Sequence, residues 1–198
     1  ARIKQSDLYI DDQRYAKEWL YAMCAAGYIS HTKGVKKFYM TEEQKAVFSF
    51  EDSSAFMLGA FDILSGNIHN INKVLSAFKT GGGVNYNESH PCIFSGTARF
   101  FRPSYSTNLI NKWIPAIPDV EMRLKNGCKI ADVGCGFGVS SVMLAKAFPK
   151  SNIFGFDIHE PSIKFANEEA QKQGLKNTQF QVADAENYKG KFDIITFF

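Results

Sequence analysis

The stretch Asp132-Val133-Gly134-Cys135-Gly136-Phe137-Gly138 is the part of this sequence that decides the fold. It includes the end of a short β-prone run, residues 129–133, and precedes an apolar helical pattern over residues 139–148. Glycines between a strand and a helix let the backbone approach a ligand, and the start of the helix offers free N–H groups. The stretch therefore predicts a ligand-binding turn, although a tight turn without a ligand has the same signature.

The residues that follow continue the alternation of strands and helices. The sequence predicts strands over residues 129–133, 152–158, 178–182 and 192–198, with helices over 139–148 and 162–173. Strands that alternate with helices of about ten to fifteen residues indicate a parallel sheet with right-handed crossovers. We therefore expect an α/β fold whose Rossmann-like parallel sheet occupies residues 126–198.

The spacing of the glycines distinguishes between two classes of cofactor. A dinucleotide fingerprint, G-x-G-x-x-G, would place its third glycine at Val139, whereas this loop has the register G-x-G-x-G. An acidic residue, Asp132, also lies within the strand before the loop. Both departures disfavour NAD and favour S-adenosylmethionine (SAM), which has no pyrophosphate. An NAD-dependent enzyme stays as an alternative that predicts nicotinamide binding.

Two further acidic residues follow the next two predicted strands. Asp157 stands about 20 residues beyond the glycine loop, where a carboxylate can accept hydrogen bonds from both ribose hydroxyls. Asp184 follows the third strand and can accept from the adenine amino group, while the Ala185 N–H faces a ring nitrogen. Because ligands bind beyond the carboxyl ends of parallel strands, we expect these groups to share one site.

These motifs, in this order, resemble those of class I SAM-dependent methyltransferases. The resemblance is carried by residues 132–138, 155–158, 184–185 and 192–198, and residues 15–20, 77–84 and 113–118 resemble a group with an N-terminal winged helix. The resemblance implies that six of the residues below contact SAM. We add Asp132 and Cys135, which belong to the first motif. The candidate cofactor-binding residues are Asp132, Gly134, Cys135, Gly136, Asp157, Ile158, Asp184 and Ala185.

The first 125 residues predict helices and one hairpin. A helix over residues 11–27 carries Tyr15 and Trp19 on one apolar face, and two β-prone runs, 28–31 and 37–40, follow it as in the second half of a winged helix. Helical patterns cover 41–79, with a break at Gly66-Asn67, and 104–125, and residues 84–98 predict a loop. We expect a partial winged helix (1–41), a helical linker and substrate-side region (42–125), and an incomplete SAM-binding domain (126–198).

Several other side chains have both a functional and a structural interpretation. Phe101 and Tyr105 precede the first strand, and they could hold the SAM sulfonium by cation–π contact or simply pack between domains. His159 could touch the ribose or face solvent, and His90 could line a substrate pocket or lie on the surface. Asp193 begins the fourth strand, at the end away from the ligand, so we expect it to be structural.

The composition is that of an ordinary soluble globular protein, with 45% hydrophobic and 22% charged residues. A net charge of +3 is too small to argue for nucleic acid, and we find no apolar run that could span a membrane. Four widely spaced cysteines without a C-x-x-C pair favour free thiols in a reducing cytoplasm over disulfides or a metal site.

From the sequence we expect a SAM-dependent methyltransferase that acts on a small-molecule acceptor and forms a homodimer through its N-terminal region. No residue can be assigned as catalytic, since the sequence stops at Phe198, and we expect a fragment of a longer protein, truncated at both ends. The alternative is a SAM-binding winged-helix regulator or nucleic-acid-binding protein without catalysis. Lys33, Lys36, Lys37 and Arg14 make the winged-helix region basic, but we favour solvated lysines on an exposed hairpin as the explanation.

Overall fold

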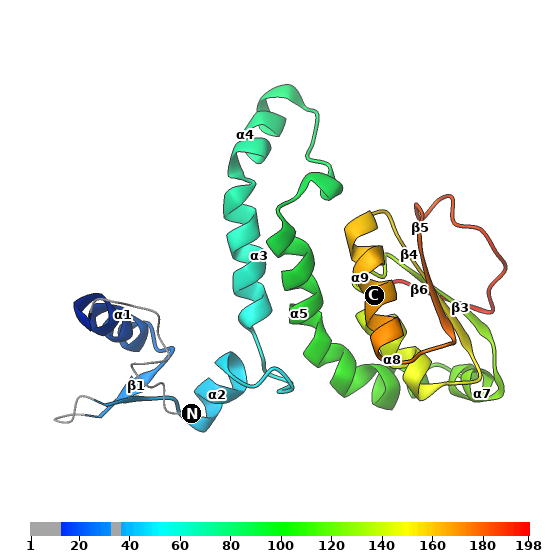
Figure 1. Ribbon diagram of the computed structural model, residues 1–198, viewed down its shortest axis with the longest axis horizontal. Helices are drawn as coiled ribbons and strands as arrows, with labels where there is room; N and C mark the ends of the chain where they lie inside the picture. The colour runs from blue at the N-terminus through cyan, green and yellow to red at the C-terminus, as the bar shows by residue number, and fades with distance from the viewer. Residues whose placement is uncertain (1–12, 33–36) are drawn as a thin grey trace. The chain divides into compact units, whose positions relative to one another are not determined.

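The computed structural model describes residues 13–32 and 37–198, which divide into two compact units (Figure 1). The first unit ends at Met57, and the second runs from Leu58 to Phe198. The expected start of the first helix at Asp11 and the expected hairpin loop at 33–36 lie outside the described residues.

The first unit is a helix followed by a hairpin and a short helix. It contains α1 (Gln13–Ala25), the antiparallel pair β1 (Ser30–His31) and β2 (Phe38–Tyr39), and α2 (Glu42–Phe48). A capping box starts α2, because the Thr41 side chain accepts from the Gln44 N–H while the Gln44 side chain accepts from the Thr41 N–H. The apolar face expected on α1 is open in this unit, since Tyr15 and Trp19 are 71% and 44% exposed.

The second unit begins with helix α3 (Leu58–His69), which packs closely against α5 (Pro91–Asn108) (Figure 1). Helix α4 (Ile71–Thr80) follows α3 in the sequence and precedes α5. The break expected at Gly66-Asn67 is wrong, because Gly66 lies inside α3 and the break comes at Asn70. A Cβ at Gly66 would come within 2.5 Å of Ile93 Cγ1. This glycine therefore lets α5 approach α3 and does not end the helix.

The loop expected over residues 84–98 is also wrong in its second half, because α5 starts at Pro91. His90 caps this helix by accepting the Cys92 N–H on Nδ1, and Pro91 occupies a first-turn position where its missing N–H costs nothing. The remaining helical pieces of this region are η2 (Tyr86–Glu88), the π-helix η3 (Leu109–Trp113), α6 (Ile114–Ala116) and α7 (Val120–Asn126). No helix in the described part of the chain is both long and apolar enough to cross a membrane.

The rest of the second unit confirms the predicted α/β fold with a parallel sheet. Four strands lie in the order β5-β4-β3-β6, and each neighbouring pair is parallel. The sequence order of the elements is β3 (Lys129–Val133), α8 (Val139–Ala147), β4 (Asn152–Asp157), α9 (Glu160–Lys172), β5 (Thr178–Val182) and β6 (Ile194–Thr196). The strands β3, β4 and β5 follow one another toward one edge of the sheet, and β6 then pairs with β3 on its other side. Ligands of such sheets bind at the carboxyl ends of the strands where the order reverses, here β3 and β6.

Each face of the sheet has its own core. Helices α8 and α9 cover one face, where Leu144 packs with Ile130 and Ile153, and Val142 packs with Phe180 (Figure 1). The loop between β5 and β6 covers the other face, where Tyr188 and Phe192 pack on Phe156. The strands are thus packed on both faces of the sheet.

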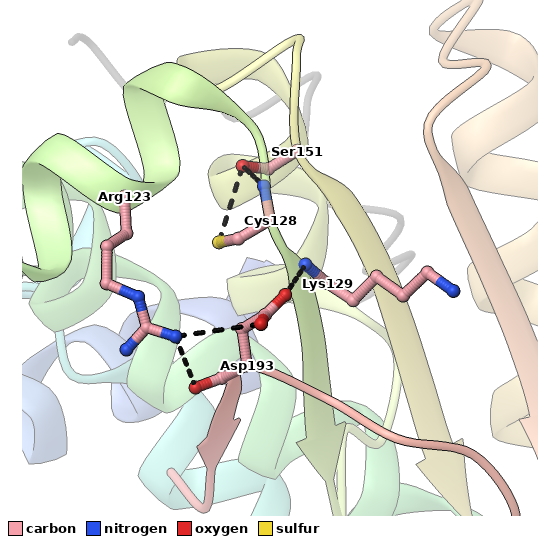
Figure 2. A network of polar contacts seen from close by, with 5 residues as sticks. All are labelled: Arg123, Cys128, Lys129, Ser151 and Asp193. Atoms are coloured by element: carbon pink, nitrogen blue, oxygen red, sulfur yellow. Dashed lines mark hydrogen bonds and ion pairs between the residues drawn. The ribbon is translucent and has the colours of Figure 1, made fainter.

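The amino-terminal edge of the sheet is closed by polar contacts centred on Asp193 (Figure 2). Asp193 accepts the Lys129 N–H on Oδ2 at 2.8 Å, and the Arg123 Nη2 donates to its backbone carbonyl at 3.1 Å. Ser151 Oγ accepts the Cys128 N–H beside them. These contacts tie the starts of β3 and β6 to α7, so the structural role expected for Asp193 is confirmed.

Candidate cofactor-binding site

A cavity lies at the carboxyl ends of β3 and β4, between the glycine loop and α5. The loop and the start of α8 form its floor, with Asp157 at one side, and the roof comes from residues before the first parallel strand. The floor includes Gly134, Cys135, Gly136, Phe137, Val139 and Ser140, and the roof includes Tyr86, Phe94, Thr97, Ala98, Phe101 and Tyr105. The site is therefore built by segments that are far apart in the sequence.

The glycine loop turns directly from β3 into α8. The N–H groups of Gly134 and Cys135 both donate to the Phe156 carbonyl, which attaches the loop to the neighbouring strand. Gly134 and Gly136 have positive φ angles of 74° and 52°, and a Cβ on either would meet no atom within 4 Å. The backbone at these two glycines is open to a ligand, as the sequence predicts.

Gly138 has a different task from the other two glycines. A Cβ there would lie 2.7 Å from Phe180 Cε1 and 2.9 Å from Ala166 Cβ, and its φ angle is 73°. Its lack of a side chain therefore lets α8 pack against α9 and β5. The third glycine of the motif supports the fold, whereas the first two face the cavity.

Asp157 ends β4 and lines the cavity. Its Oδ2 accepts the Gly136 N–H and its Oδ1 accepts the His159 N–H, both at 2.8 Å. An ionised carboxylate has about four acceptor positions, so each oxygen keeps one for a further donor. The side chain is held in place and can still accept from a pair of hydroxyl groups.

Asp132 lies beneath the loop with only 1% of its surface exposed and does not line the cavity. The hydroxyls of Ser140 and Ser141 donate to its Oδ2 at 2.7 and 2.5 Å, and the Thr196 hydroxyl donates to Oδ1 at 3.2 Å. Burial raises the pKa of this carboxyl, against the effect of the hydroxyl donors. Asp132 joins β3 to the first turn of α8 and to β6, beneath the ligand-facing surface.

Cys135 lines the cavity but is almost fully buried. Burial, with the charges of Asp132 and Asp157, raises the pKa of its thiol far above the usual value of 9.0. The thiolate is the reactive form of cysteine, so this side chain fills space and is not a nucleophile.

The other candidates lie outside the cavity wall. Ile158 is 41% exposed, and Asp184 and Ala185 are exposed in the turn after β5. Asp184 Oδ1 accepts the Glu186 N–H at 2.9 Å, and the Ala183 N–H donates to the Asp157 carbonyl. These residues follow β4 and β5 at the edge where the cavity opens, and their contacts to adenine stay a prediction.

The Asp157 side of the roof consists of rings that the sequence did not place in the site. Phe94 on α5 stacks on His159 with ring centroids 3.6 Å apart, and Tyr86 contacts Phe94 edge-on at 5.0 Å. Burial, and secondarily the charge of Asp157, raises the pKa of Tyr86, which therefore stays a neutral phenol. His159 also caps α9 through Nδ1, which accepts the Ser162 N–H. His90 instead caps α5 and stacks on His69, away from the cavity wall.

These features fit SAM. The open backbone at Gly134 and Gly136 admits the methionine part of such a molecule, and Asp157 offers acceptors for ribose hydroxyls. Among the described residues that line the cavity, Asp157 is the only aspartate, glutamate, lysine or arginine.

Comparison with known proteins identifies the domain. A family model described as a methyltransferase domain matches residues 124–198. Ribosomal protein L11 methyltransferase of Caldanaerobacter subterraneus is 37% identical over 77 residues, which are 38% of this chain and 25% of that protein. The tRNA (guanine-N(7)-)-methyltransferase of Acinetobacter baylyi is 43% identical over 54 residues, 27% of this chain and 22% of that protein. The chain thus spans about a quarter of the length of these curated relatives.

A solved structure extends the likeness over most of the chain. The putative O-methyltransferase of Nostoc punctiforme PCC 73102 superposes with a TM-score of 0.62 at 18% identity, over 93% of this chain and 56% of that one. At this identity the likeness shows the fold alone. Residues 124–198 thus match a methyltransferase domain, and their parallel sheet has a Rossmann-like methyltransferase fold.

Proposed function

We propose that this chain belongs to a SAM-dependent methyltransferase that transfers a methyl group to a small-molecule acceptor. One observation carries the proposal: in a methyltransferase domain, the open backbone of Gly134 and Gly136 and the carboxylate of Asp157 face the same cavity. SAM carries its methyl group on a positively charged sulfur, so the transfer is a direct in-line displacement. The residues of this chain contribute binding and orientation, which can supply most of the acceleration of such a step.

Each part of the site has a role in this proposal. Asp157 fixes the ribose, and the open glycines hold the methionine part against α8. Phe94 and Tyr86 cover the Asp157 side and keep water from it. Burial raises the pKa of both tyrosines that line the cavity and of Cys135, and the one lining carboxylate, Asp157, is given to the ribose in this proposal. We therefore assign no catalytic residue.

The roof favours a small acceptor over a macromolecule. Its residues on α5 lie in the same unit as the glycine loop, and they restrict the approach to the cavity. The relatives named above act on a ribosomal protein and on tRNA by their names, so they do not decide the acceptor. The four free thiols support our expectation of a reducing compartment such as the cytoplasm.

We also propose that two copies of the chain pair through the helical region before the parallel sheet, and that helix α1 and the β1–β2 hairpin are part of a winged helix. An apolar stripe follows α3 and α4 at alternating spacings of four and three residues, the pattern of a helix–helix seam. The exposed members of the stripe are Leu64, Ile68, Ile71, Leu75 and Phe78. A second copy of the same stripe is a matching occupant. Sedimentation of the chain and of Leu75→Glu tests this: dimers that the substitution dissociates are expected, and a monomeric wild type refutes pairing.

Calorimetry with SAM and with NAD, followed by a methyl-transfer assay, tests the enzymatic part. We expect the chain to bind SAM and not NAD, and to label a set of small hydroxyl and amine acceptors in preference to ribosomal protein or tRNA. A lack of any SAM affinity would refute the proposal. SAM binding without transfer, together with salt-dependent DNA binding, would favour a regulator instead.

A further inference from the structure

One side of the cavity, opposite Asp157, is a group of aromatic rings contributed by α5 and by the segment after β6. Phe101 and Tyr105 lie one turn apart on α5 and stack with centroids 6.0 Å apart. The ring centroids of Phe198 and Tyr105 are 5.7 Å apart. The ring of Trp113 contacts both, with its centroid 6.1 Å from that of Tyr105 and 6.3 Å from that of Phe198. Phe101, Tyr105 and Phe198 line the cavity, and we refer to these three residues as the aromatic wall.

The order of the strands places the aromatic wall on a particular part of a bound SAM. In the sheet β5-β4-β3-β6, Asp157 ends β4, the glycine loop follows β3, and Phe198 follows β6. If Asp157 holds the ribose and the open glycines after β3 hold the methionine part, the sulfur that joins these two parts is displaced from β4 toward β3 and β6. The aromatic wall stands at that side of the cavity.

The surroundings of the aromatic wall are compatible with a cation there. Arg99, on the same helix, points to α3, where its Nη1 contacts Asp62 Oδ2 at 3.1 Å. Asp132 lies below, and burial together with the charge of this aspartate raises the pKa of the Tyr105 phenol, which stays neutral. Phe101 and Phe198 keep 43% and 44% of their surface exposed, so a ligand can cover their rings. The faces of aromatic rings carry a negative electrostatic potential, which attracts a positive group.

We propose that the aromatic wall binds the positively charged sulfonium of SAM by cation–π contact and so makes the site prefer SAM over S-adenosylhomocysteine (SAH), the neutral product. The inference rests on the proposed function, because it assumes that SAM occupies the cavity. It adds a property that methyl transfer alone does not require. A site of this kind releases its product more readily than it releases its substrate.

Calorimetry with SAM and with SAH, on the whole chain and its variants, tests the aromatic wall. Tyr105→Leu and Phe101→Leu remove a ring and keep an apolar side chain. We expect each to weaken SAM about 2- to 30-fold more than SAH, the range that corresponds to a cation–π contact. Tyr105→Phe keeps the ring, and its ratio of the two dissociation constants should stay near the wild-type ratio.

Phe94→Leu is the matched control, because its ring stacks on His159 at the Asp157 side. It should weaken SAM and SAH by the same factor. If the leucine variants on α5 fail to fold, Phe198→Leu decides, since this exposed side chain can be changed with little effect on the core. Equal weakening of SAM and SAH in the leucine variants overturns the inference. A wild-type chain that binds neither molecule overturns the proposed function itself, which is a different result.

Discussion

The Gly136 N–H donates to the Asp157 carboxylate at 2.8 Å, and this bond joins the loop after β3 to the end of β4. The two residues are therefore one unit, in which the carboxylate is oriented by the same loop that offers its backbone to the ligand. Asp157 combines a positioning role with free acceptor positions. A substitution there acts on both.

Asp157→Ala should weaken SAM binding by roughly 1–3 kcal/mol, because charged hydrogen bonds to the ribose are lost. Calorimetry gives the affinity, and Asp157→Asn, which keeps one acceptor oxygen, should fall between alanine and wild type. Asp193→Ala is the matched control at the opposite edge of the sheet, where the side chain accepts from the Lys129 N–H. An equal loss of affinity in the control would show that the effect comes from the sheet as a whole.

The second prediction separates the glycines of the loop. Gly138→Ala should lower the free energy of unfolding by about 1–3 kcal/mol, because its Cβ would collide with Phe180 and Ala166. Gly136→Ala meets open space and should reduce stability by only about 1–2 kcal/mol through its positive φ angle. Denaturant unfolding and SAM calorimetry on both variants check this.

The ratio of the two effects is the decisive quantity. Gly136→Ala should lose more affinity per unit of lost stability than Gly138→Ala, since only Gly136 faces the cavity. If both variants lose stability and affinity in the same proportion, the division of tasks among the glycines is wrong.

The sheet and half of the site could be predicted because their signals are local. The glycine loop, the strand before it and Asp157 are each recognisable from a pattern of a few residues, and the structure brings them together. The helical roof could not be predicted in the same way. Gly66 predicts a break by propensity, yet it sits in α3 because α5 passes within contact distance. Pro91 predicts a loop, yet His90 caps a helix that starts there.

The aromatic contacts of the roof depend on distant parts of the chain. Phe94 meets His159 only because α5 lies over the ends of the strands, and no periodicity in the sequence specifies that pairing. Phe101 and Tyr105 precede the first strand, and the sequence alone is equally consistent with sulfonium binding and with packing between domains. The buried position of Asp132 likewise depends on hydroxyls from α8 and β6, which its motif does not identify.

Asp132 gives a third prediction. Asp132→Ala removes the acceptor of three hydroxyls in a buried setting and should lower the free energy of unfolding by about 2–4 kcal/mol. A double-mutant cycle with Ser141→Ala should show a coupling of about 1–2 kcal/mol, because the two residues are in direct contact. Chemical denaturation measures all four proteins of the cycle. Additive effects would mean that the Ser141 hydroxyl contributes nothing to holding this carboxyl.

The last prediction concerns pH and His159. Burial lowers the pKa of this imidazole from its usual 6.5, while the charge of Asp157 acts in the opposite direction and is the smaller effect. The folded chain therefore prefers the neutral ring, whose Nδ1 accepts the Ser162 N–H at the start of α9. As pH falls below 6.5 the unfolded chain binds more protons than the folded chain at this position, so the free energy of unfolding decreases.

His159→Asn isolates this effect, because asparagine also caps helices but does not titrate. Thermal or denaturant unfolding between about pH 5 and 7.5 should show a smaller loss of stability on acidification in the variant than in the wild type. If the free energies of unfolding of the wild type and of His159→Asn change equally with pH, His159 has the same proton affinity in the folded and unfolded chains. Phe94→Leu, which removes the ring stacked on His159, should reduce the burial of the imidazole and bring the pH dependence part of the way toward that of the variant.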